Sequence, residues 1–201
     1  MLIFLILAPY GAFSLLMLVS SPAVSLLAAA AIALVVIAYD MVGGRSIKML
    51  GAGSAILFAS LGCYLLLVDS SWSGSAVKLT VDAGMLTIAL ASLAIRFPFT
   101  LQYAREVNDA ETAAMPGFVR ANYIITAAWT AAFALMLLAN VLMIYVPGLP
   151  LWSGLAIAFA ARNTALYFTR WYPEYRRTKF AASIAISSSL RANGSALSAA
   201  R

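Results

Sequence analysis

Six long apolar stretches, separated by short polar connections, fill the first 170 residues of the chain. They cover residues 1–19, 22–39, 49–68, 79–95, 122–146 and 149–169. A helix needs roughly 20 apolar residues to cross the hydrocarbon layer of a bilayer. The pattern therefore predicts an all-α, polytopic membrane helix bundle with about six transmembrane helices. We expect a single transmembrane domain over residues 1–173 and a Ser/Ala-rich basic tail over 174–201, mobile apart from one frayed helix.

Composition supports this class and excludes several others. The chain is 64% hydrophobic and only 10% charged, whereas soluble domains carry about 25% charged residues. There is no histidine, and Cys63 is the single cysteine. We therefore expect no metal and no cofactor, and we interpret Cys63 as a small apolar filler. The first stretch lacks preceding basic residues, so we expect a membrane helix rather than a cleaved signal peptide.

Basic residues are concentrated on one side of the predicted bundle. Eleven of them fall before the third stretch, before the fifth stretch or after the sixth, and only Lys78 falls in the opposite connections. Lys and Arg collect in cytoplasmic loops, so both termini are predicted to be cytoplasmic. The formal charge of +6 is explained by this bias, and we expect the lipid bilayer, not nucleic acid, as the partner.

Residues 98–114 show a different periodicity. Apolar residues recur at helical spacing from Phe99 and Tyr103, while Gln102 and Arg105 belong to the polar face. This predicts a short amphipathic helix on the inner membrane surface, started by a proline and stopped by Pro116. Its candidate partner-binding residues are Phe99, Gln102, Tyr103 and Arg105; the alternative is a solvated loop.

Ionisable groups inside a membrane are expensive and need a partner. Asp82 lies one turn after Lys78, which alone could satisfy it. Arg162 lies midway along the last stretch, next to Asn163. Asp82, Asn140, Arg162 and Asn163 are therefore candidates for one polar spot, which either binds a lipid headgroup or other anion or is a structural network.

Small residues recur along the third stretch at Gly51, Ala55, Ala59 and Cys63. Such stripes let membrane helices approach closely, and we expect this one to pack. No motif of an enzyme site is present: there is no metal cluster, nucleophile elbow or phosphate loop. We therefore expect a protein that is not an enzyme.

Several local motifs resemble the intracellular septation protein A family of bacterial inner-membrane proteins. The motifs, in chain order, are Pro9, the basic connection Arg45 to Lys48, Lys78-Leu79-Thr80, the run from Arg96 through Pro98 to Gln102, and Asn122, Trp129 and Ala139-Asn140. The resemblance covers roughly residues 8–172. It implies a multi-pass protein of the bacterial inner membrane that serves cell-envelope maintenance or cell division.

Three hypotheses follow. The first is a scaffold that contacts division or cell-wall synthesis membrane proteins, or a second copy of itself in a homo-oligomer, through its cytoplasmic face. The second is a small transporter or carrier of lipids or anions that uses the polar spot. The third is an accessory subunit of a larger membrane complex, favoured if the small-residue stripe on the third stretch faces outward.

Overall fold

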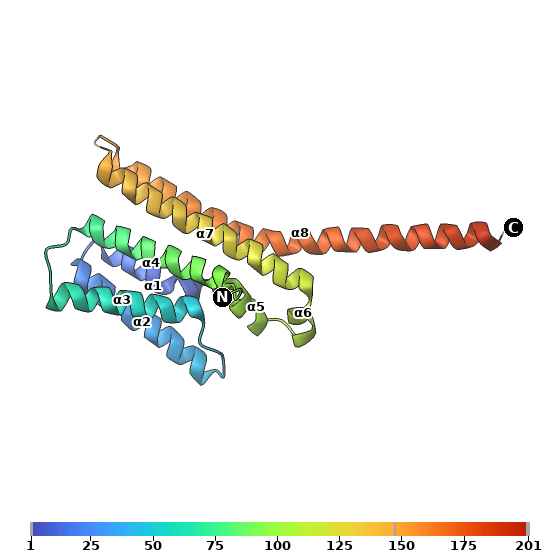
Figure 1. The fold of residues 1–201 in the computed structure, drawn as a ribbon, viewed down its shortest axis with the longest axis horizontal. Coiled ribbons are helices and arrows are strands. Elements are labelled where there is room, and N and C mark those ends of the chain that lie inside the picture. Colours follow the sequence, from blue (N-terminus) through green and yellow to red (C-terminus); the bar gives the residue numbers. More distant parts are fainter. Residues whose placement is uncertain (1, 147, 200–201) are drawn as a thin grey trace. The chain divides into compact units, whose positions relative to one another are not determined.

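The computed structural model describes residues 2–146 and 148–199, and the side chains of 8–146, 148–150 and 152–179. These described residues form helices joined by short connections and contain no strand (Figure 1). The helices are α1 (Leu2–Leu16), α2 (Pro22–Val42), α3 (Met49–Leu67), α4 (Gly74–Ala94), α5 (Phe99–Glu106), α6 (Ala110–Ala114), α7 (Pro116–Tyr145) and α8 (Leu151–Ala199). The expected all-helical class is confirmed.

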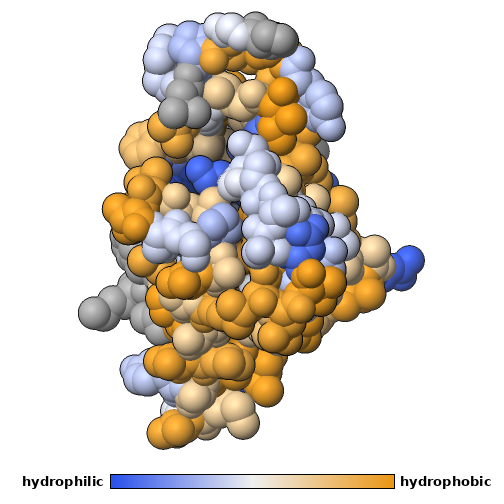
Figure 2. Space-filling view, turned by 90° about the vertical axis from the view of Figure 1, so that its left-hand side faces the viewer, coloured by the Kyte–Doolittle hydropathy of each residue, from blue (hydrophilic) through white to orange (hydrophobic). Residues whose placement is uncertain are grey.

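Four of the described helices, α2, α3, α4 and α7, are long and apolar enough to cross a membrane. Their outward side chains are hydrophobic: Ile56 is 70% exposed and Val35 is 67% exposed. Hydrophobic residues also cover most of the face seen in Figure 2, with hydrophilic residues gathered in patches. A soluble domain rarely exposes such continuous apolar surface, so these helices suit a lipid environment.

Two helices begin earlier than the sequence predicts. Helix α4 begins at Gly74 rather than 79 because the Ser73 hydroxyl caps it, accepting a hydrogen bond from the Ala76 N–H at 3.2 Å. Helix α7 begins at Pro116 rather than 122. Proline is favoured at the first position of a helix, where its missing N–H is not needed. Pro116 therefore starts one helix as well as ending the one before it.

The last helix is longer than predicted. Helix α8 continues through Pro173 to Ala199, so its predicted end at 169 is wrong. Alanine and arginine, which recur through this stretch, are strong helix formers. The chain divides into two compact units, Met1–Ala165 and Leu166–Arg201, where we expected a boundary at 173.

Close helix contacts in the first unit depend on glycines. A Cβ atom added at Gly84 would lie 2.5 Å from Leu57 of α3, and one at Gly62 would lie 2.9 Å from Leu27 of α2. These glycines, rather than the whole predicted stripe, bring the backbones together. Within that stripe Ala55 is buried but Cys63 is exposed, because the stripe turns away from the neighbouring helices toward its end.

The predicted single helix over 98–114 is two helices, α5 and α6. The break falls at Val107–Asp109, because Asp109 caps α6 by accepting a hydrogen bond from the Thr112 N–H at 2.7 Å. Helix α5 packs against α7, where the Thr100 hydroxyl donates to the Asn122 carbonyl at 2.9 Å. The expectation that Phe99 contacts the membrane surface is wrong, since Phe99 is only 3% exposed.

Candidate functional site

The first polar cluster lies inside the bundle around Asp82, which is 3% exposed. The Tyr10 hydroxyl of α1 donates to Asp82 Oδ1 at 2.7 Å, and Asn140 Nδ2 of α7 donates to Asp82 Oδ2. Asp82 and Asn140 therefore meet, as expected from the sequence, and Tyr10 joins them. We call Tyr10, Asp82 and Asn140 the inner triad; it connects α1, α4 and α7.

The other residues proposed for this spot behave differently. Within the part of the chain that the structure describes, the ion pairs join Asp40 and Glu106 to cations of the α2–α3 connection, so Lys78 forms none with Asp82. Asn163 is half-buried and donates to the Phe159 carbonyl of its own helix at 2.7 Å, so it lies outside the triad. Its short side chain is satisfied one turn back along α8.

Arg162 is the unusual member. Its Nε atom is buried, and no described residue provides it with a hydrogen-bond partner. Its guanidinium carbon lies 5.8 Å from the centroid of the Phe159 ring, and its charge acts electrostatically on Tyr10. The structure therefore places an incompletely satisfied cation near the inner triad, although not in an ion pair with Asp82.

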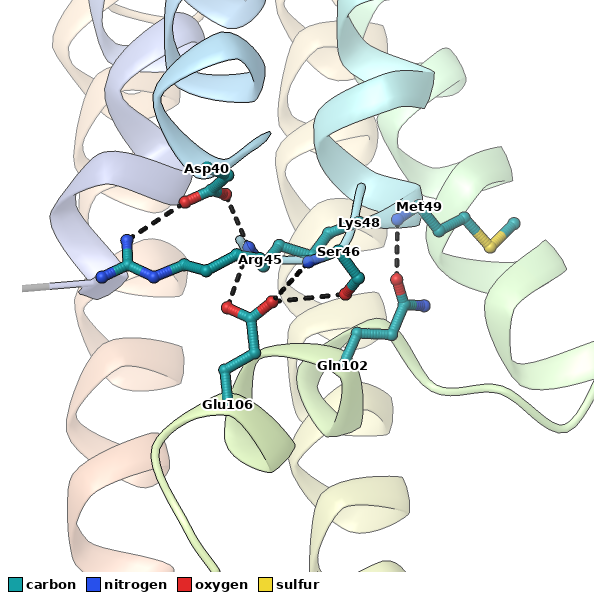
Figure 3. Close-up of polar contacts among 7 residues, drawn as sticks. All are labelled: Asp40, Arg45, Ser46, Lys48, Met49, Gln102 and Glu106. Carbon is teal, nitrogen blue, oxygen red and sulfur yellow. Dashed lines mark hydrogen bonds and ion pairs between the residues drawn. The ribbon is translucent and has the colours of Figure 1, made fainter. Parts of the chain in front are cut away.

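A second cluster, which sequence reasoning missed, joins the end of α2, the α2–α3 connection, the start of α3 and α5 (Figure 3). We call it the helix-end network. Its members are Asp40, Arg45, Ser46, Lys48, Met49, Gln102 and Glu106.

Lys48 is the centre of this network. Its ammonium group lies 2.6 Å from Asp40 Oδ2 and 2.9 Å from Glu106 Oε2, and its side chain is 3% exposed. Arg45 Nη1 adds a second cation 3.3 Å from Asp40 Oδ1. Two cations thus meet two carboxylates, so the network is balanced in charge.

Backbone groups complete the network. The Ser46 N–H and hydroxyl both donate to Glu106 Oε1, at 3.1 and 3.2 Å. The Met49 N–H, at the start of α3, donates to Gln102 Oε1 at 2.7 Å. Helix N-terminal N–H groups have no partner within their own helix, so Gln102 supplies one from α5.

Tyr103 lies beside the same charges. Its ring centroid is 5.4 Å from Lys48 Nζ, a cation–π distance. Burial raises the pKa of the Tyr103 hydroxyl well above its usual value, and the nearby carboxylates of Asp40 and Glu106 raise that pKa further. Tyr103 therefore stays neutral and serves as packing for the cation.

The four predicted partner-binding residues differ in their exposure to the surface. Phe99 and Gln102 are buried, Gln102 at 6% exposure, and Tyr103 is partly buried. Arg105 alone of the four is exposed, with its guanidinium carbon 6.0 Å from the centroid of the Phe97 ring. Only Arg105 of this set is therefore free to contact a partner.

No group of three or more metal-binding side chains gathers within the part of the chain that the structure describes. The two clusters can hold helices in register, and the buried guanidinium of Arg162 can attract an anion. Comparisons with protein-family models, with curated proteins and with solved structures find no match.

Proposed function

We propose that the protein crosses the bacterial inner membrane six times, with both termini in the cytoplasm. Helix α1 and the first part of α8 supply the two crossings beyond α2, α3, α4 and α7. The charge distribution supports this: Arg45, Lys48 and Arg105 lie at the bundle end where α2 meets α3 and α5. Basic residues favour the cytoplasmic side.

Within this membrane we propose a non-enzymatic scaffold of cell-envelope maintenance or cell division. The observation that carries the proposal is Lys48, buried between Asp40 of α2 and Glu106 of α5. This contact fixes α5 to the bundle, so its outward face does not need to be ordered when a partner binds. Pre-organised surfaces bind with a smaller entropy loss.

The proposed docking face consists of exposed residues next to the network. Arg105 is exposed, Phe97 is 43% exposed and Val107 is 64% exposed. An arginine flanked by apolar side chains is typical of residues that dominate protein interfaces. The resemblance noted above points to division or cell-wall synthesis membrane proteins as its partners.

Site-specific photo-crosslinking in native membranes tests this function. A photoreactive amino acid replaces Val107, and in a matched control it replaces Ile56, which is 70% exposed on α3. We expect a discrete protein adduct from position 107 and lipid adducts from position 56. Lipid adducts alone from both positions overturn the scaffold. An adduct between two copies indicates a homo-oligomer, and a fixed set of adducts at both positions indicates an accessory subunit.

Arg162 favours a second candidate, a carrier of lipids or anions. A buried guanidinium nitrogen without a partner is costly in a membrane, and an anionic group would satisfy it. The test is mass spectrometry of the molecules retained after purification in mild detergent. Loss of a retained anionic lipid on Arg162→Leu, but not on Asn163→Leu, supports the carrier; identical retention in both variants overturns it.

A further inference from the structure

The part of α8 after Ala165 carries an aromatic stripe that the scaffold proposal does not use. Phe168, Trp171, Tyr172 and Tyr175 recur at intervals of three and four residues, which places them on one face of a helix. Phe168 stacks on Tyr172 with centroids 5.0 Å apart, and Trp171 stacks on Tyr175 at 4.9 Å. Trp171 and Tyr175 remain 40% and 36% exposed.

Basic residues lie within and directly after the stripe. Lys179 continues it, with its Nζ atom 5.0 Å from the centroid of the Tyr175 ring. Arg170, Arg176 and Arg177 are exposed and distribute charge around the other sides of the helix. Glu174 is the single acid between residues 166 and 179. Four cations against one acid in this stretch suit an anionic partner such as the headgroup layer of a membrane.

The spacing along the helix matches the layers of a membrane leaflet. Tryptophan and tyrosine collect at the boundary between hydrocarbon and headgroups. Four residues separate Tyr175 from Lys179, which is about 6 Å along a helix. The headgroup region of one leaflet is roughly 5–7 Å thick. With the aromatic stripe at the boundary, the basic residues therefore reach the phosphates.

We propose that residues 168–179 form an anionic-phospholipid binding segment, in which the aromatic stripe sets the depth and Arg176, Arg177 and Lys179 bind headgroup phosphates. The inference rests on the membrane placement of α8 proposed above. It adds a lipid preference to that placement and does not depend on which protein the scaffold contacts.

Fluorescence quenching of Trp171 tests the proposal in the full chain. Replacing Trp72, Trp129 and Trp152 by phenylalanine leaves Trp171 as the only tryptophan, which is excited selectively over the tyrosines. The protein is reconstituted into two kinds of vesicle with the same proportions of phosphatidylglycerol and phosphatidylcholine. In the first only the phosphatidylglycerol carries bromine, and in the second only the phosphatidylcholine does. We expect preferential quenching by the anionic lipid, with a preference of about fivefold for each basic residue that contacts it.

The deciding variant is Arg176→Gln/Arg177→Gln/Lys179→Gln, which should reduce the preference to near one. The matched control, Arg96→Gln/Arg105→Gln/Arg120→Gln, removes the same charge from exposed positions elsewhere and should retain it. Equal loss in both variants assigns the preference to net charge and overturns the proposal.

The two proposals fail differently. Equal quenching by both lipids in the parent protein overturns the anionic-lipid site while leaving α8 in the membrane. No quenching by either lipid overturns the membrane placement of this part of α8 as well. Binding of a fluorescent RNA or of an acidic protein that is lost with the triple α8 variant, without a lipid preference in the parent, assigns the segment to that partner instead.

Discussion

Lys48 shows how much one buried residue can control. It is 3% exposed and is shared by Asp40 and Glu106, so its charge stabilises two carboxylates at once. Removing one member of a buried ion pair costs more than the pair contributes, because the remaining charge stays buried. The energetic role of the network is therefore best measured at Lys48.

We predict that Lys48→Met destabilises the protein by about 3–5 kcal/mol. Arg45→Gln should cost less than about 1 kcal/mol, because the Arg45 side chain is 36% exposed and Lys48 remains as the ion-pair partner of Asp40. The measurement is equilibrium unfolding in mixed detergent micelles. Adding Asp40→Asn and Glu106→Gln to Lys48→Met should recover most of the loss. Equal losses for the two single variants would contradict the prediction.

The sequence could not predict these partners. Asp40 and Lys48 lie eight residues apart, and Glu106 belongs to a different helix; only helix packing brings them together. Asp82 and Asn140 could be paired by their depth in the membrane, whereas Tyr10 could not, since it lies midway along an apolar helix and carries no charge that would require a partner. Charged residues at the ends of apolar stretches were the available signal for the network.

Among the elements, α3 and α4 approach closely at Gly84. We predict that Gly84→Ala destabilises the bundle by about 1–3 kcal/mol through overpacking, since the new Cβ would lie 2.5 Å from Leu57 Cδ2. Leu57→Ala in the same chain should reduce that loss. Gly51→Ala is the control, because its nearest neighbour would be 3.8 Å away. Thermal denaturation in detergent compares the variants, and a larger loss at Gly51 would refute the prediction.

Helix α6 should depend on pH through its cap. Hydrogen bonds from the Thr112 N–H and then its hydroxyl hold the pKa of Asp109 below its ordinary value of 3.8. The ionised carboxylate therefore stabilises α6 fully at pH values above the ordinary pKa. This stabilisation is lost as the pH falls through the lowered pKa.

The ¹⁵N NMR shift of the Thr112 amide should report this loss. Asp109→Asn keeps an oxygen acceptor at the cap and should remove the pH dependence, whereas Asp109→Ala should leave α6 frayed at every pH. An unchanged titration in the Asn variant would show that another group controls α6.

The type of element could be predicted better than its limits. Apolar length identifies helices, but their ends depend on local hydrogen bonds, such as the Ser73 cap of α4. The apolar pattern predicts Pro116 only as a stop because Arg120 interrupts the apolar run and moves the predicted start of the next helix to 122. The extension of α8 through Pro173 was missed since proline usually interrupts a helix.

At the scale of the molecule, cysteine labelling tests whether α8 crosses the membrane. In a Cys63→Ser background, we expect Leu149→Cys to react with a membrane-impermeant maleimide from outside the cell. Lys179→Cys should react only after permeabilisation. Ser70→Cys, in the α3–α4 connection, is the control for the outer side. Labelling of both test positions from the same side would mean that α8 does not cross.

The helix-end network also orders the assembly of the chain in time. Glu106 is synthesised 58 residues after Lys48 (106 minus 48), a delay of roughly 3–12 s at the usual rate of translation. Throughout that interval Lys48 has Asp40 as its carboxylate partner, while α3 and α4 leave the ribosome. The second ion pair therefore forms only after α2, α3 and α4 have been synthesised, which makes the docking of α5 a late step of biogenesis.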